Sequence, residues 1–414
     1  MRYAQGLFKS PKGRANCYHM GGLLQGDDGQ GLNHLLTQSP WEYKEVFARL
    51  LKSAIELLQA QKQKIYVPLD EVGFRKKGKH SACVGNQYLG CIGKNDNGQV
   101  AVTAALSAGE YYCPVQMELF MPKDWQDDAA RRAKAGIPEG KKHESKTVMA
   151  LRMIKALQKK LSKSIECVLF DALYGNATDL LYQLYKQRIP FVGDIKKNLT
   201  VFLGQPKWIE QPYSGRGRKP IYKKLSKKAE HVNDYANSLS KKDFTRLTVR
   251  KGTKGTVHAL YHMCKVWLLH EPSQTLLPLH LLVRKNADGS LKFALGFFND
   301  RVTLMRLAKA QAQRQFVERV FEEGKNIVGL GDYHVRSWEG FHKHAALCCL
   351  NLLFLMQQKI KLKASLGKIT AYQLQELVNA SISALSSLEQ VINRLLVQIP
   401  EYQRQIENQL KRVT

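Results

Sequence analysis

The sequence predicts an α/β protein with a mixed β-sheet and flanking helices. From residue 64 to residue 119, apolar residues recur at every second position, which is typical of strands, and clusters of Gly, Asn and Asp separate the segments. From residue 145 to residue 195, helical spacing alternates with short apolar runs, as in parallel strands joined by a helix. Beyond residue 303 the spacing is mostly helical.

The charge of the chain points to a polyanionic partner. The 414 residues include 64 Lys and Arg against 35 Asp and Glu, a formal net charge of +29. Lys and Arg side chains release counterions when they bind phosphates, so nucleic acid is the expected partner; a charge that serves only solubility is the alternative. With 44% hydrophobic residues the chain is too apolar to be mainly disordered, and its length suggests about two or three domains.

The cysteines and the apolar segments indicate a reducing compartment without a membrane. None of the eight cysteines has C-x-x-C spacing, so no structural zinc site is predicted. His342, His344, Cys348 and Cys349 are expected to pack in the core. The start of the chain lacks the apolar run of a signal peptide, and the longest apolar stretch, 345–356, is too short to span a membrane. The sequence therefore predicts a cytoplasmic protein.

Helices are expected at both ends of the chain. Ser39 and Pro40 fit the start of a helix that continues to about residue 58, and a shorter helix ends near Leu36. The two are either a helix-turn-helix that reads DNA or an ordinary packing pair. Toward the C-terminus, the pattern predicts helices over 303–325, 338–360, 371–396 and 401–412.

The elements between these helices follow a known order. The pattern predicts strands over 64–70, 82–88, 99–106 and 114–119, a helix over 145–161, a strand over 167–170, a helix over 178–188 and a strand over 191–195. A basic, turn-rich segment with β-branched runs follows, and one more strand, 291–298, precedes the long helix. This is the order of the RNase H-like fold: antiparallel strands come first, then two parallel strands with helices, then an insertion and a helix.

This order divides the chain into five predicted regions. They are a helical N-terminal region that binds DNA or packs on the core (1–62), the first part of an RNase H-like catalytic core (63–197), a basic β-rich insertion domain (198–292), the second part of the core with the helix that carries Glu318 (293–362), and C-terminal helices (363–414).

Two acidic residues stand at the ends of buried strands in this order, Asp70 and Asp171. The RNase H-like topology places the two strands side by side, so the carboxylates are expected to converge where open α/β sheets bind ligands. Hard oxygen ligands of this kind select Mg²⁺ or Mn²⁺, and two such ions about 4 Å apart catalyse phosphoryl transfer. Strand-end caps or ion pairs are the alternative roles for these residues.

A third acid is expected on the helix after the insertion. At about 100° per residue, Arg314, Glu318 and Lys325 project from one stripe, which suits a metal site beside a phosphodiester. An amphipathic surface helix with i,i+4 ion pairs is the alternative. Glu322 lies about 40° from Glu318 and one turn further along, whereas Glu323 lies about 140° away and faces the other side. Glu318 is therefore the predicted ligand.

Together these motifs resemble those of bacterial insertion-sequence transposases of the DDE type, whose RNase H-like core is split by a β-rich insertion. The segment DEVGFRKKGKHS that begins at Asp70 resembles the first signature of the family, and DALYG, which begins at Asp171, resembles the second. Arg314, Glu318 and Lys325 match the Tyr-x2-Arg-x3-Glu-x6-Lys signature. In that signature Gln311 takes the place of Tyr. The segments 125–136 and 332–344 also look familial, and the likeness covers about residues 1–360.

The resemblance implies a reaction and its participants. Asp70, Asp171 and Glu318 would hold two Mg²⁺ or Mn²⁺ ions that activate water to nick the end of a mobile element, and the freed 3′-hydroxyl would attack another strand. Arg314 and Lys325 would hold phosphates at the cleaved terminus. The partner would be double-stranded DNA, both element ends and target, bound by a homodimer when two ends are paired, at the bacterial nucleoid in the cytoplasm.

Other basic residues are further candidates for DNA contacts, and Gln311 adds a polar contact on the Arg314 stripe. Lys76, Lys77 and Lys79 follow the first strand; they contact phosphates or form a charged turn. In the segment Gly-Arg-Gly-Arg-Lys-Pro, the two arginines resemble a minor-groove hook, and a basic solvated loop fits equally well. These arginines are Arg216 and Arg218.

Two other functions would fit the same fold. A domesticated DNA-binding protein would keep the fold without catalysis, but it would have no need of all three acids. A plain metal-dependent nuclease would need the acids but not a large basic insertion, which favours a transposase that holds paired DNA ends.

Overall fold

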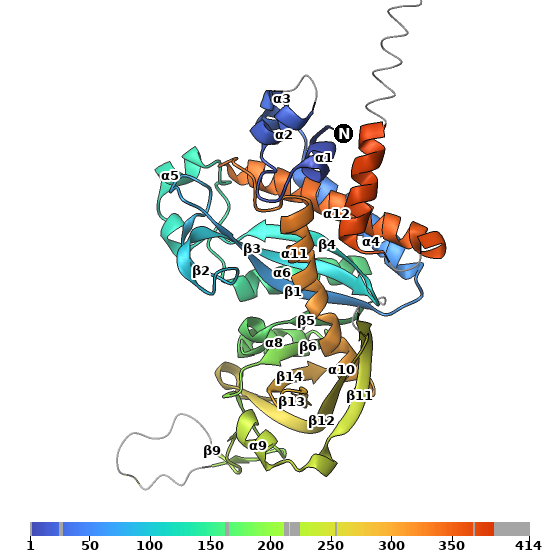
Figure 1. Ribbon diagram of the computed structural model, residues 1–414. Coiled ribbons are helices and arrows are strands. Elements are labelled where there is room, and N and C mark those ends of the chain that lie inside the picture. The colour runs from blue at the N-terminus through green and yellow to red at the C-terminus, as the bar shows by residue number, and fades with distance from the viewer. Residues whose placement is uncertain are drawn as a thin grey trace, which may run out of the picture.

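One large mixed sheet organises the computed structural model, which describes residues 2–24, 28–161, 165–210, 215, 224–252, 255–366 and 369–384 (Figure 1). The sheet has ten strands, in the order β11-β12-β13-β14-β6-β5-β1-β3-β2. The tenth strand, β4, pairs with the later residues of β3, while β2 pairs with the first ones. The chain is therefore a mixed α/β protein, as the sequence predicts.

Several strands, such as β1, β3 and β5, are longer than the hydrophobic pattern alone suggests, whereas β2 and β14 are shorter. Those of the large sheet are β1 (Ile65–Arg75), β2 (Gly85–Leu89), β3 (Lys94–Ala108), β4 (Tyr111–Leu119), β5 (Ile165–Phe170), β6 (Phe191–Ile195), β11 (Thr245–Gly252), β12 (Gly255–His270), β13 (Thr275–Lys285) and β14 (Leu291–Phe297). Two small two-stranded sheets are formed by β7 (Thr200–Val201) with β10 (Glu230–His231), and by β8 (Trp208–Ile209) with β9 (Lys224–Leu225).

The centre of the sheet has the strand directions that the sequence predicts. β1 runs parallel to β5, which runs parallel to β6, and β1 is antiparallel to β3. β5 is apolar because its residues Cys167 to Phe170 are buried by elements on both faces, as expected for an interior parallel strand. The strand that carries Asp70 and the strand that ends just before Asp171 are thus direct neighbours.

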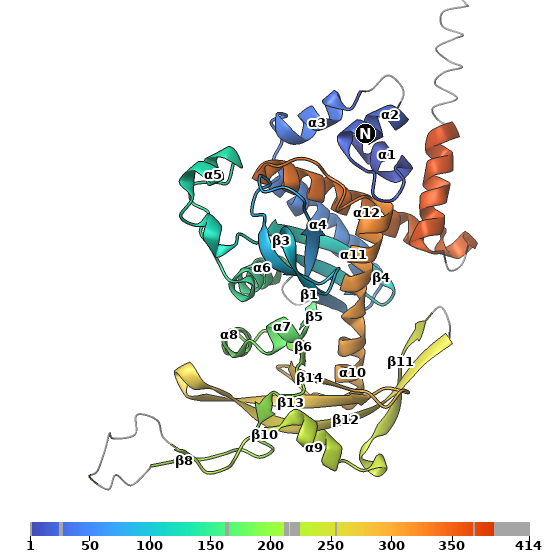
Figure 2. The same ribbon diagram turned by 60° about the vertical axis from the view of Figure 1, so that its left-hand side comes forward.

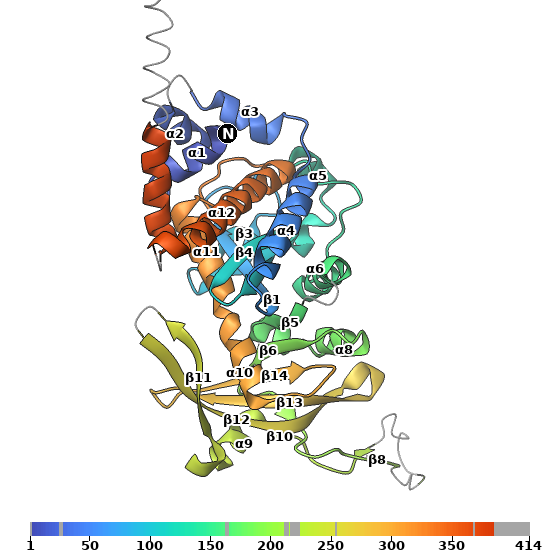
Figure 3. The same cartoon turned by 90° about the vertical axis from the view of Figure 1, so that its right-hand side faces the viewer.

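Helices cover both faces of this sheet. They are α1 (Arg2–Lys9), α2 (Cys17–Leu23), α3 (Gln30–Thr37), α4 (Tyr43–Gln59), α5 (Ala129–Lys134), α6 (Lys146–Leu161), α7 (Ala172–Gly175), α8 (Thr178–Lys186), α9 (Val232–Ser238), α10 (Leu304–Gln313), α11 (Gln315–Ile327) and α12 (Trp338–Leu366). Figure 3 shows the strands β3 and β4 between α11 on one side and α4 and α6 on the other. A further helical segment covers 371–384.

The strands after residue 244 extend the central sheet. β11, β12, β13 and β14 form successive antiparallel pairs, and β14 in turn pairs with β6. Figure 2 shows this broad layer beneath α10. β14 therefore crosses the predicted boundary between the insertion (198–292) and the second part of the core (293–362). The division of the chain into five regions stays a prediction.

Three local expectations are wrong. The helix predicted from Ser39 begins at Tyr43, after its N-cap Glu42, because the Ser39 carbonyl instead accepts a hydrogen bond from Lys343 Nζ at 2.6 Å. The segment 122–142, in which the pattern predicts neither a helix nor a strand, contains α5. The single helix predicted over 303–325 is interrupted at Arg314, whose N–H donates to the carbonyl three residues back instead of four.

The histidines and cysteines of α12 pack in the core, as predicted. His342, His344, Cys348 and Cys349 are at most 1% exposed. Among the described residues, α12 is the one helix long and apolar enough to cross a membrane, and half of its most apolar window is buried inside the protein. A core helix passes the same test. The predicted helix 401–412 and the end of the one predicted over 371–396 lie outside the described residues.

The close packing of α7 on β6 predicts a sensitive glycine. A Cβ atom on Gly175 would lie 1.9 Å from the Asp194 carbonyl oxygen, which is a backbone atom that cannot turn aside. We expect Gly175→Ala to lower the free energy of unfolding by about 1–3 kcal/mol, the usual cost of overpacking a core. Urea unfolding followed by circular dichroism measures it. Gly140→Ala, where no atom lies within 4 Å, is the control; equal losses in both variants would contradict the packing.

Candidate active site

The two predicted aspartates lie on neighbouring parallel strands. Asp171 follows β5 directly and caps α7, because its Oδ1 accepts hydrogen bonds from the N–H groups of Leu173 at 2.9 Å and Tyr174 at 3.5 Å. Asp70 does not end its strand as expected. It lies within β1, opposite Thr103 of β3, because the pairing with β3 continues to Arg75 and the alternate residues Val72 and Phe74 are buried.

The two carboxylates are close enough to disturb each other. Burial, and next the negative charge of Asp171, raise the pKa of Asp70 to about 7. Burial also raises the pKa of Asp171, with a contribution from Asp194. A carboxylate with a pKa near neutrality marks a place where added positive charge is favourable. The pair is therefore suited to bind a cation.

Arg314 joins the acids of the site. Its Nη1 lies 3.6 Å from Asp70 Oδ2, its Nε 2.9 Å from Asp194 Oδ2 and its Nη2 2.9 Å from Glu318 Oε1. Burial alone would lower the pKa of Arg314, but these carboxylates and Asp171 outweigh it and raise the pKa. One guanidinium thus connects β1, β6 and α11.

Asp194 belongs to this group although we did not predict a role for it. It lies near the end of β6, the second parallel strand, and its Oδ1 accepts a hydrogen bond from Gln311 Nε2 at 2.9 Å. The signal in the sequence was an acid at a third strand end, next to the two strands already singled out. Its partners, Gln311 and Arg314, come from a helix far along the chain, so spacing alone does not reveal them.

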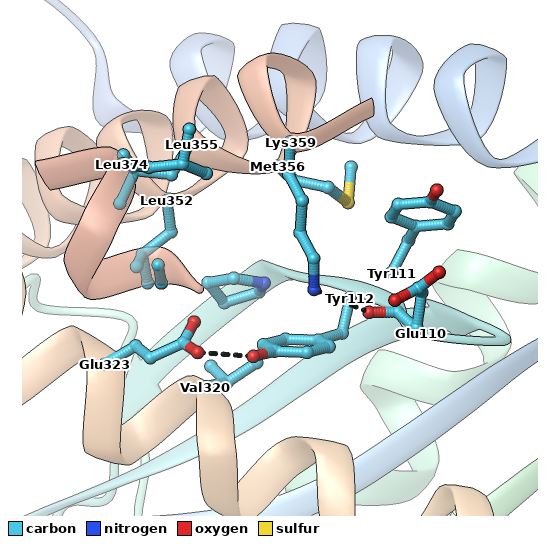
Figure 4. Close-up of a pocket in the computed structure, with 12 residues that line it drawn as sticks. Glu110, Tyr111, Tyr112, Val320, Glu323, Leu352, Leu355, Met356, Lys359 and Leu374 are labelled. Carbon is cyan, nitrogen blue, oxygen red and sulfur yellow. Dashed lines mark hydrogen bonds between the residues drawn. The ribbon is translucent and has the colours of Figure 1, made fainter. Parts of the chain in front are cut away.

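The helical faces predicted for the three glutamates agree with the structure. The Glu318 side chain is 60% exposed and bonds to Arg314 one turn earlier. Glu322 is exposed one turn beyond it. Glu323 faces the other side of α11, where its carboxylate accepts a hydrogen bond from the Tyr112 hydroxyl in a pocket that Lys359 also lines (Figure 4). Among the three, Glu318 is the one that contacts Arg314, which also contacts Asp70 and Asp194.

Lys325 also reaches β1. Its Nζ donates to the Gly73 carbonyl at 3.0 Å and lies 5.6 Å from the centre of the Phe74 ring. Burial lowers the pKa of its ammonium group. Lys325 is therefore held beside the strand that carries Asp70, while Gln311, the residue at the Tyr position of the signature, is held at Asp194.

A second polar cluster links the first two signatures. Glu71 Oε2 forms an ion pair with Lys146 Nζ at 2.6 Å, and its Oε1 accepts a hydrogen bond from the Tyr174 hydroxyl at 3.5 Å. Burial raises the pKa of Glu71 despite this partner. The residue after Asp70 is thus tied to α6 and to the turn after Asp171, which fixes the relative position of the two aspartates.

The remaining predicted DNA contacts differ in their surroundings. Lys76 Nζ lies 3.4 Å from the centre of the Tyr333 ring, and burial lowers its pKa to about 8, so this side chain is held by the 332–344 segment. Lys77 and Lys79 are exposed. Arg216 and Arg218 lie outside the described residues.

The chemistry of the acid group fits a divalent cation. Asp70, Asp171, Asp194 and Glu318 offer only hard oxygen ligands, and one guanidinium balances part of their charge. Within the described ranges, no three His, Cys, Asp or Glu side chains are arranged to hold a metal ion together. Three of the acids, Asp70, Asp194 and Glu318, instead contact the Arg314 guanidinium.

Comparisons with known proteins agree with the motifs. A family model described as DDE superfamily endonuclease matches residues 3–256. A probable transposase for insertion sequence element IS701 from Microchaete diplosiphon is 34% identical over 152 residues, and the match spans 36% of each chain, about a third of the length of that relative.

A solved structure also has a weak likeness. The piggyBac transposase synaptic complex with hairpin DNA aligns with 79% of this chain and 54% of that chain at 10% identity, with a TM-score of 0.37 that is too low to support an argument. The family model alone covers more than half of the sequence. The chain belongs to the DDE superfamily of endonucleases.

Proposed function

We propose that this protein is an insertion-sequence transposase with an RNase H-like core, which cleaves DNA at the ends of a mobile element and joins it to a target. The observation that supports it most is the meeting of acids from β1, β6 and α11 at Arg314, beside Asp171 at the end of β5. The family membership and the likeness to the IS701 transposase agree with this proposal.

Each residue has a role that its position supports. Asp70, Asp171 and Glu318 would hold Mg²⁺ or Mn²⁺, two ions in the proposed reaction, and such ions would supply an activated water and stabilise the leaving oxygen in phosphoryl transfer. Arg314 and Lys325 lie on one stripe beside these acids and hold the phosphates of the strand to be cut. Asp171 is fixed for this task by its cap on α7.

The proposed partner is double-stranded DNA. The net charge of +29 supports it, since neutralised phosphates release counterions and strengthen binding. Exposed Lys77 and Lys79, and Arg216 and Arg218, are proposed contacts outside the catalytic residues. Pairing two element ends requires two active sites, so we propose a homodimer in the DNA complex, at the nucleoid in the cytoplasm.

The acids of the site also bear on the two alternative functions, a DNA-binding protein without catalysis and a plain nuclease. A DNA-binding protein without catalysis would gain nothing from a half-buried Asp70 whose pKa is raised to about 7, because such a group costs stability at neutral pH. A plain nuclease would make the same first cut as a transposase. Only the joining of the freed 3′-hydroxyl to a second strand distinguishes these two, so the assay must detect joined products.

The central prediction is metal-dependent cleavage that each aspartate controls. On a plasmid that carries the DNA flanking this gene, with Mg²⁺, we expect Asp70→Asn and Asp171→Asn to lower cleavage and joining by several orders of magnitude. Binding of the same DNA in a mobility-shift assay should remain. Neither variant should melt earlier than the parent, because each removes a buried, repelled charge. Asp234→Asn, an exposed position on α9, is the control.

Full cleavage in EDTA, or in either of the two variants, would refute the metal site. Cleavage without joined products under all conditions would favour the plain nuclease instead.

A second prediction identifies the third ligand on α11. We expect Glu318→Gln to abolish cleavage, because Glu318 is the glutamate that contacts the acid group through Arg314. Glu322→Gln, one turn further along and exposed, should only weaken it. The measurement is the single-turnover cleavage rate on the same plasmid. If Glu322→Gln were the more damaging change, the ligand would be Glu322 and the assignment by helical face would be wrong.

A further inference from the structure

The contacts of Arg314 compete with metal binding. Its guanidinium contacts Asp70 Oδ2 at 3.6 Å and Glu318 Oε1 at 2.9 Å, and both residues are ligands under the proposed function, on which this inference rests. A metal ion would approach the same oxygens to about 2.1 Å and would repel the guanidinium. Both cations therefore cannot occupy this position at once.

Asp194 holds Arg314 at this position from a different strand. One carboxylate oxygen contacts Arg314 Nε at 2.9 Å, and the other accepts a hydrogen bond from Gln311 Nε2 at 2.9 Å. Gln311 is only 7% exposed, so its amide is fixed by packing. The position of the guanidinium among the acids is thus a defined one, supported independently of Asp70 and Glu318.

A second group of cations lies next to the same guanidinium. A pocket beside Asp194 is lined by Arg284 of β13 and Lys292 of β14, which are paired across the two strands, and by Arg314 itself. The same pocket is also lined by the carboxylates of Asp194 and Glu318 and by Val249, Gln311, Ala312 and Gln315. The three cations outnumber the two carboxylates, so the pocket carries a net positive charge that attracts a phosphate, and an arginine prefers a phosphate that it can bind with two N–H groups.

We propose that Arg314 is an internal counter-ion that a DNA backbone phosphate displaces from the acids. In the DNA-free protein, its guanidinium balances part of the charge of Asp70, Asp194 and Glu318 and excludes metal. When a phosphate binds between Arg284, Lys292 and Arg314, the guanidinium turns toward it and releases Asp70 and Glu318. DNA binding and metal binding are then positively coupled, and the metal-loaded acids are assembled only on DNA.

The direct test is Mn²⁺ binding by the DNA-free full-length protein, followed by the electron paramagnetic resonance signal of free Mn²⁺. We expect Arg314→Gln to bind Mn²⁺ about tenfold more tightly than the parent, within the range usual for coupled sites. Arg314→Lys should fall between the two, because an ammonium group cannot bridge three carboxylates in a fixed geometry. Adding Asp70→Asn to Arg314→Gln should remove the gain.

The matched control is Arg301→Gln, which removes an exposed cation just before α10 and should leave Mn²⁺ binding unchanged. A second arm uses the reciprocity of coupling. At matched ionic strength, Mn²⁺ should strengthen the binding of a fluorescent DNA duplex to the parent about tenfold relative to the Asp70→Asn variant. The same addition should have no such effect on Arg314→Gln.

Mn²⁺ binding to both Arg314 variants that is equal to or weaker than that of the parent would overturn the proposal. This failure differs from failure of the proposed function, in which the parent would show no metal-dependent cleavage of DNA. If circular dichroism shows that Arg314→Gln does not fold, the Mn²⁺ affinity of Arg314→Lys alone tests the proposal. This variant retains the charge and loses only the bridging geometry.

Discussion

The site depends on the bridging of separate carboxylates by the Arg314 guanidinium. Asp70, Asp194 and Glu318 come from β1, β6 and α11, and each contacts a different nitrogen of the same side chain. Neighbouring carboxylates that are partly shielded from water repel one another and cost stability unless a cation balances them. Arg314 supplies part of that charge at the break between α10 and α11, so the helix that follows the insertion is held to the centre of the sheet.

The other familial segments support the site without entering it. Lys76 of the first signature rests on the Tyr333 ring, and the Tyr333 hydroxyl donates to Gln99 Oε1 at 2.7 Å, which ties the turn after β1 to the 332–344 segment. Arg131 lies over the Trp125 ring and donates to the Lys79 carbonyl at 3.4 Å. These contacts fix the end of β1, so they hold the strand that carries Asp70 in register.

Local patterns predicted what depends on local spacing. The apolar runs indicated β5 and β6, and the 3.6-residue period placed Glu318 beside Arg314 and Glu323 on the opposite face. The extension of β1 beyond Asp70 was not predicted, although Val72 and Phe74 continue the apolar alternation and are buried, because the residues between and after them are charged or glycine. Asp194 was missed because its role comes from Gln311 and Arg314, which only the folded chain brings to β6.

The most direct test of the account is where a bound metal ion lies. Fe²⁺ in place of Mg²⁺, with ascorbate and peroxide, produces radicals that cut the backbone next to the ion. In the DNA complex, the account predicts cuts near residues 70, 171 and 318 together, each suppressed by excess Mg²⁺. Cuts confined to one of these segments, or cuts elsewhere that Mg²⁺ suppresses, would contradict a single site built from all three acids.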